Sequence, residues 1–328
     1  MTEVHINSGG LYIPQTEWRQ TPLRAALGEI VGAPPRTKVS EYMCDEESDQ
    51  DMAVRLVRAA LRWSLPLVLR GCAAHMPAIR RWRNTSYLRE TALEAFSPVL
   101  APGSSIEFTG NLDELEPSLL ADSWWPQPFG ELLWDFALDA GAKGLWVSAG
   151  GKRAAAHYDT FDNLHVVVGG SKTFRLVSPG AAAHMYVDFP ENECPGNGVF
   201  GCDGLGCYAF VPFDADDVDL RTFPRVGDAA VHTATLNEGD VLFIPALWFH
   251  YIIHHPLNGG GRCFALTFTQ QQTWRDGNGP HSPGSADLSA YYDEIARKRK
   301  DDPMWAAWTA SVRSESKGDD QNDNKNEL

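Results

Sequence analysis

The chain has 328 residues, of which 43% are hydrophobic and 22% charged, so it can bury a sizeable core and is not a globally disordered protein. Its formal net charge of −15 argues against nucleic acid as a partner, because such binding depends largely on neutralising phosphates, and favours a basic protein substrate. No apolar run reaches the roughly eighteen residues that span a membrane, so we expect no membrane association.

The N-terminal sequence MTEVHINSGG lacks the apolar segment of a secretory signal. The chain also has 6 cysteines, which in the absence of such a signal are expected to be reduced thiols. These two features predict a cytoplasmic or nuclear protein.

The first half of the chain predicts a mixture of helices and short strands. Residues 1–50 are interrupted by prolines and are expected to be irregular. Val54, Val57 and Leu61 recur at helical spacing and predict a helix over 51–63. Further along, the pattern predicts a buried strand over 65–72, a helix over 85–95 and a strand over 105–110.

From about residue 143 the pattern changes to short β-strands. Residues 144–150 predict one strand, and residues 163–179 predict a hairpin around Gly169-Gly170-Ser171. A second pair of strands is expected around Glu238-Gly239-Asp240, followed by a strand over 262–270. Several short strands at this spacing are typical of a barrel or sandwich.

Three segments complete the expected domain organisation. A long loop rich in glycine and proline is expected over 190–227, inside a main domain of residues 51–285. Residues 286–313 predict two C-terminal helices with exposed aromatic residues, which either dock on the barrel or form a homodimer. Residues 314–328 are expected to be a disordered tail.

The strongest candidate for chemistry is the sequence His157-x-Asp159. On a strand, residues two apart point to the same face, so this pair places an imidazole beside a carboxylate. His250 lies on another predicted strand and can complete a set of two histidines and one carboxylate, the facial triad of non-haem Fe(II) oxygenases. The pair by itself is also compatible with ordinary polar residues on a β-barrel.

Lys172 is a second candidate, because it follows the Gly-Gly turn and shares a strand face with Phe174 and Leu176. That pattern points its side chain into the core, where a lysine needs a partner. An anionic ligand, such as a dicarboxylate that also chelates the metal, would supply one. The alternative is a lysine at the strand end that reaches solvent.

His165 and His254 also share strand parity with the candidate residues. His165 is interpreted as a satisfied core or edge histidine, and His254 as a residue that supports the ligands or is exposed to solvent.

Together, His157-x-Asp159, Asn163, Lys172 and the sequence GDVLFIPALWFH over 239–250 resemble the JmjC, cupin-like, Fe(II)- and 2-oxoglutarate-dependent oxygenases. The resemblance covers roughly residues 60–270 and is greatest to the JmjC-only protein hydroxylases of the lysyl hydroxylase type. It implies a mainly β fold with flanking helices, built on a double-stranded β-helix (jelly roll).

The resemblance also implies roles for single residues. His157, Asp159 and His250 would bind Fe(II). Lys172 would pair with the distal carboxylate of 2-oxoglutarate. O₂ would be the second cosubstrate. Asn163 and Thr267 would lie beside the cosubstrate, and Trp146 would close its pocket.

The sequence departs from the family at several positions around the cosubstrate. Ala154 stands where relatives often have a hydroxyl residue, and Phe108 stands where they often have tyrosine. The function implied by the resemblance is hydroxylation of a protein side chain, with lysine favoured. The alternatives are a JmjC demethylase or nucleic-acid hydroxylase, and a cupin-like binding protein with little turnover.

Overall fold

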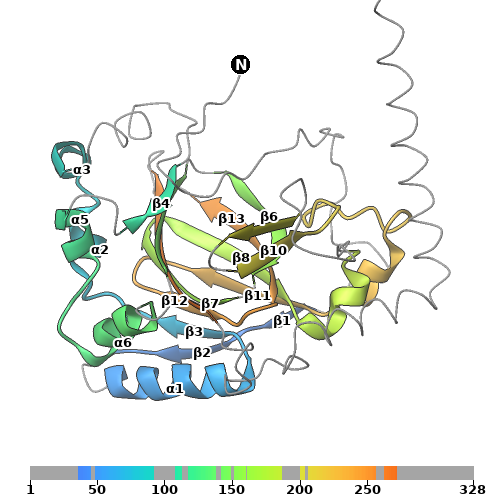
Figure 1. Ribbon diagram of the computed structural model, residues 1–328, viewed down its shortest axis with the longest axis horizontal. Coiled ribbons are helices and arrows are strands. Elements are labelled where there is room, and N and C mark those ends of the chain that lie inside the picture. The colour runs from blue at the N-terminus through green and yellow to red at the C-terminus, as the bar shows by residue number, and fades with distance from the viewer. Residues whose placement is uncertain are drawn as a thin grey trace, which may run out of the picture.

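The computed structural model describes most of the central part of the chain (Figure 1). The described residues are 36–45, 49–91, 108–112, 117–137, 142–148, 151–159, 161–186, 200–203, 206–255 and 262–271. The expected C-terminal helices and tail, and with them the expected homodimer contact, lie outside these residues. Within them, no helix is both long and apolar enough to cross a membrane.

Two seven-stranded sheets form the body of the molecule. The first sheet has the strand order β1 (Arg36–Lys38), β11 (Val231–Leu236), β8 (Ser171–Val177), β13 (Phe249–His255), β6 (Arg153–Asp159), β10 (Gly206–Phe210) and β9 (Phe200–Asp203). The second sheet has the order β2 (Ser40–Met43), β3 (Leu67–Arg70), β12 (Val241–Ile244), β7 (Phe161–Gly169), β14 (Cys263–Gln271), β5 (Ala142–Ser148) and β4 (Phe108–Asn111).

Helices lie mainly outside the second sheet. Figure 1 shows α1 running alongside β2 and β3, with the other α-helices on the same side of the molecule. The helices are α1 (Asp49–Trp63), α2 (Pro77–Arg81), α3 (Thr85–Thr91), α5 (Pro117–Asp122) and α6 (Pro128–Phe136), with the 3₁₀ turns η2 (Pro179–His184) and η3 (Pro224–Asp228). The predicted helix over 51–63 is therefore confirmed, and the helix predicted over 85–95 is present in its described part, residues 85–91.

The core has three layers because strands alternate their side chains between two faces. Between the sheets, Val68, Val167 and Leu242 of the second sheet share one cluster with Phe174 and Leu176 of the first. The outer face of the second sheet packs on the helices, and the outer face of the first sheet packs on η2, η3 and the segment between β10 and β11. The prediction of a mainly β jelly roll with flanking helices is confirmed.

The predicted hairpins are wrong, because the strands on either side of each glycine turn belong to different sheets. β7 pairs with β12 and β14, whereas β8 pairs with β11 and β13. The chain crosses between the sheets at Gly170, whose φ of +79° places it in the left-handed region. A Cβ there would lie 2.6 Å from the backbone oxygen of His255. A glycine turn between two β-rich segments has the same sequence pattern whether it closes a hairpin within one sheet or carries the chain from one sheet to the other.

The N-terminal segment is more ordered than predicted over residues 36–43. β1 pairs in parallel with β11, and β2 pairs in parallel with β3. These two short strands therefore extend both sheets at one edge. Neither has the length or alternation that would distinguish it in the sequence.

The prediction of a loop over 190–227 is also corrected, because this segment contains β9, β10 and most of η3. β10 pairs with β6, with Phe210 opposite His157 and Tyr208 opposite Asp159. Backbone hydrogen bonds between β10 and β6 hold part of this glycine-rich segment, and the composition of the segment does not reveal them.

The expectation that all cysteines are reduced is also wrong for two of them. Cys44 and Cys72 form a disulfide, with their Cα atoms 5.0 Å apart. The parallel pairing of β2 with β3 brings these residues together across 28 positions of sequence. Cys263 is a free, buried thiol.

Candidate metal centre

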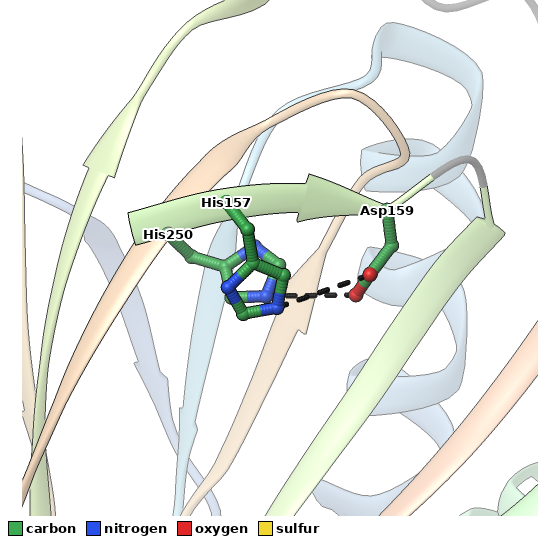
Figure 2. A group of neighbouring side chains, drawn as sticks. All are labelled: His157, Asp159 and His250. Atoms are coloured by element: carbon green, nitrogen blue, oxygen red, sulfur yellow. Dashed lines mark ion pairs between the residues drawn. The ribbon is translucent and has the colours of Figure 1, made fainter. Parts of the chain in front are cut away.

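The three predicted metal ligands meet at two neighbouring strands of the first sheet. His157 on β6 is in register with His250 on β13, and Asp159 lies two residues along β6 on the same face. Figure 2 shows the two imidazoles side by side, with the carboxylate of Asp159 turned towards them. The imidazole ring centres are 4.2 Å apart.

The spacing between the carboxylate and each imidazole suits a single ion. The Nε2 atom of His157 lies 3.9 Å from Oδ1 of Asp159, and Nε2 of His250 lies 3.5 Å from Oδ2. One ligand atom from each residue can be chosen so that all lie within 4.8 Å of one another. Two atoms that are each about 2.1 Å from an ion are at most about 4.2 Å apart, so both carboxylate contacts are short enough.

Backbone carbonyls orient both imidazoles. Nδ1 of His157 lies 2.7 Å from the oxygen of Ala155, and Nδ1 of His250 lies 3.0 Å from the oxygen of Trp248. When each Nδ1–H donates to its carbonyl, the lone pair is left on Nε2, which faces Asp159. Burial, with the neighbouring His157, lowers the pKa of His250 to about 3, so this imidazole is neutral and able to bind a metal at neutral pH.

The predicted cosubstrate residues lie on the inner faces of the two sheets. Lys172 is only 1% exposed and alternates with the buried Phe174 and Leu176, so its predicted inward direction is confirmed. Asn163 and Thr267 are buried on the second sheet. In-register pairing places Asn163 opposite Thr269 on β14.

Trp146 and Thr267 contact each other directly. The indole N–H of the half-buried Trp146 donates to Oγ1 of Thr267 at 3.1 Å. Gly144, opposite Thr267, makes room for the contact, since a Cβ there would lie 2.4 Å from this oxygen. The structure thus brings Trp146 to the expected side of the second sheet and gives it a defined partner.

Two further histidines are buried near the predicted cosubstrate residues. His165 and His254 are both buried, and the Nε2 atom of each has no hydrogen-bond partner in the described part of the chain. The interpretation of His165 as a satisfied histidine is therefore corrected. Strand alternation in the sequence places both histidines on the inner faces, because His165 follows Asn163 by two residues and His254 follows His250 by four.

The residues present fit Fe(II) and 2-oxoglutarate. Two imidazoles and one carboxylate form the donor set of the non-haem iron triad. Beside them are a buried lysine and three buried polar atoms without a partner in the described residues: Oδ1 of Asn163, Nε2 of His165 and Nε2 of His254. Buried polar atoms are normally hydrogen-bonded, so this region is suited to a polar, anionic ligand.

A jelly roll with two histidines and an aspartate gathered between its sheets is typical of cupin-like proteins. The family model of the cupin-like domain matches residues 109–273, half of the chain. The protein belongs to this cupin-like (JmjC) family.

Individual relatives refine the comparison. Human tRNA wybutosine-synthesizing protein 5 is 32% identical over 118 residues, which cover 36% of this chain and 32% of that protein. Human bifunctional peptidase and (3S)-lysyl hydroxylase JMJD7 is 22% identical over 237 residues, covering 57% of this chain and 72% of that protein. JmjC domain-containing protein C of Dictyostelium discoideum is 26% identical over 136 residues, covering 38% of this chain and 30% of that protein. The matched region thus spans about a third of the wybutosine protein's own length.

Proposed function

We propose that this protein is an Fe(II)- and 2-oxoglutarate-dependent oxygenase that hydroxylates a protein side chain. The observation that carries the proposal is the convergence of His157, Asp159 and His250 on one face of a cupin-like sheet. The buried Lys172 supports a chelating dicarboxylate as the second ligand, as do the buried polar atoms of Asn163, His165 and His254 that have no partner among the described residues.

The residues of the site would have separate roles. His157, Asp159 and His250 hold the ion, and Lys172 orients the acid at the far end of the cosubstrate. The surrounding buried residues keep water from the reacting atoms. Iron bound with 2-oxoglutarate supplies the oxidation, in which one atom of O₂ enters a substrate C–H bond as hydroxyl and the other enters succinate, with release of CO₂.

Lysine is the favoured target, because the relative JMJD7 is named as a lysyl hydroxylase. The formal net charge of −15 supports a basic protein substrate for this acidic chain. A cytoplasmic or nuclear location is part of the same proposal.

A second candidate is hydroxylation of a tRNA base, which the similarity to tRNA wybutosine-synthesizing protein 5 favours. The acidity of the chain weighs against it, because tRNA binding needs cationic groups to neutralise phosphates. A demethylase, or a binding protein with little turnover, would share the same metal centre.

The test is to load purified protein with Fe(II) and measure bound iron and the 2-oxoglutarate-dependent release of succinate with protein extract or with tRNA. Mass spectrometry then locates the added oxygen. We expect His157→Ala to lose both iron and succinate release, and His75→Ala, a change to an exposed histidine outside the triad, to keep both. The proposal fails when His157→Ala alters neither quantity. Oxygen found only on tRNA would select the second candidate.

A further inference from the structure

Two buried histidines lie next to Lys172 and have no part in metal binding. His254 on β13 is directly opposite Lys172 on β8, in the first sheet. His165 reaches the same region from β7 of the second sheet, where its ring packs edge-on against Phe174 with centroids 4.9 Å apart. His165 is 3% exposed and His254 is 7% exposed.

Burial and the neighbouring charge of Lys172 keep both imidazoles neutral. Burial, followed by the charge of Lys172 and the neighbouring His254, holds the pKa of His165 well below its usual value. Burial and Lys172 lower the pKa of His254 to about 2. Both imidazoles are therefore neutral at physiological pH, and each can offer an N–H donor without adding charge.

The Nε2 atoms of both histidines are the ring nitrogens left available to a ligand among the described contacts. Nδ1 of His254 is hydrogen-bonded to the hydroxyl of Ser148, which is itself buried. When Ser148 donates to Nδ1, the ring proton is placed on Nε2. Nε2 of His254 and Nε2 of His165 are both buried, and neither has a hydrogen-bond partner in the part of the chain that the structure describes.

We propose that His165 and His254 are specificity-determining residues, which donate through Nε2 to the same ligand carboxylate that meets Lys172. The carboxylate would then be held by one cation and two neutral donors, and the unpartnered atoms would be satisfied only when the ligand is bound. This inference rests on the proposed function, because the carboxylate is the distal one of 2-oxoglutarate.

The experiment measures ligand affinity by calorimetry on full-length protein loaded with Zn(II), which cannot turn over. Two ligands are compared: 2-oxoglutarate, and 2-oxobutyrate, which lacks the distal carboxylate. We expect His165→Leu and His254→Leu each to weaken 2-oxoglutarate binding about tenfold or more and to leave 2-oxobutyrate binding unchanged. Glutamine keeps a donor near the Nε2 position, so His254→Gln should restore most of the affinity.

The matched control is His255→Leu. His255 is adjacent to His254 on β13, but its Nε2 contacts Oγ1 of Thr173 at 3.0 Å, on the opposite face. This variant should bind both ligands as the unchanged protein does. A second readout needs no variant: 2-oxoglutarate should shift the Nε2 resonances of ¹⁵N-labelled histidines 165 and 254, and 2-oxobutyrate should leave them in place.

The outcomes separate the inference from the proposed function. Wild-type protein that binds Zn(II) but not 2-oxoglutarate overturns both. Wild-type protein that binds 2-oxoglutarate, with leucine variants of equal affinity or unshifted imidazole resonances, overturns the inference alone.

Discussion

Acidification should destabilise the metal-free protein because of its buried histidines. The pKa of His254 is lowered to about 2, first by burial and then by Lys172, and that of His250 to about 3, first by burial and then by His157. In the unfolded chain both return to about 6.5. At a pH between the folded and the unfolded pKa values, the unfolded state binds more protons than the folded state. The free energy of unfolding therefore keeps its full value above pH 6.5 and falls as the pH drops below 6.5.

The size of the loss follows from these values. At pH 5 each imidazole that is neutral when folded and has a pKa of about 6.5 when unfolded costs about 2 kcal/mol, so the two together cost about 4 kcal/mol. His165, whose pKa is also lowered, adds to the loss in the same direction. Domains of this kind are stable by about 5–15 kcal/mol, so the effect is large enough to measure and can unfold the protein.

Urea unfolding of metal-free protein at pH 7.5 and pH 5.0, followed by tryptophan fluorescence, measures the loss directly. In His254→Gln one titrating group is absent, so the difference between the two pH values should shrink by about 2 kcal/mol. His75→Gln, at an exposed histidine, should leave the difference unchanged. Equal stability at both pH values, or a difference in His254→Gln as large as in the unchanged protein, would refute the reasoning.

Two further predictions concern single buried charges. Lys172→Met should weaken 2-oxoglutarate binding by about tenfold or more, the value of a charge-assisted hydrogen bond, while the metal-free protein stays as stable or becomes more so. Calorimetry and urea unfolding test this, with the exposed Lys38→Met as control, and unchanged affinity would contradict it. Asp122→Asn should lower the free energy of unfolding by about 3–5 kcal/mol, because this fully buried carboxylate accepts hydrogen bonds from Arg81, Trp82 and Tyr87. Thermal unfolding of this variant beside the exposed Asp135→Asn measures the difference, and equal melting temperatures would disprove it.

The direction in which strand residues point was determined by the sequence alone. Alternation placed His157 beside Asp159 and turned Lys172 inward with Phe174, and the structure has both arrangements. Alternation is set by the covalent geometry of an extended chain, so it can be inferred without knowing what the strand pairs with. The resemblance carried by PALWFH and the spaced lysine then indicated the jelly roll.

The partner of each strand was decided only by the tertiary structure. The sequence around Gly170 predicts a hairpin, but β7 is buried on both faces and takes β12 and β14 as neighbours. Pairing depends on the burial of all strands at once, which no local pattern contains.

The same reason explains the other features that the sequence did not reveal. The short edge strands over 36–43 and the Cys44–Cys72 disulfide depend on a neighbouring strand already being in place. His165 and His254 come from different sheets, and only the folded structure shows that their Nε2 atoms have no hydrogen-bond partner among the described residues. The sequence determined which side chains face inward, because that is a local property of a strand. The tertiary structure decided which of them meet, because that depends on how distant strands pack.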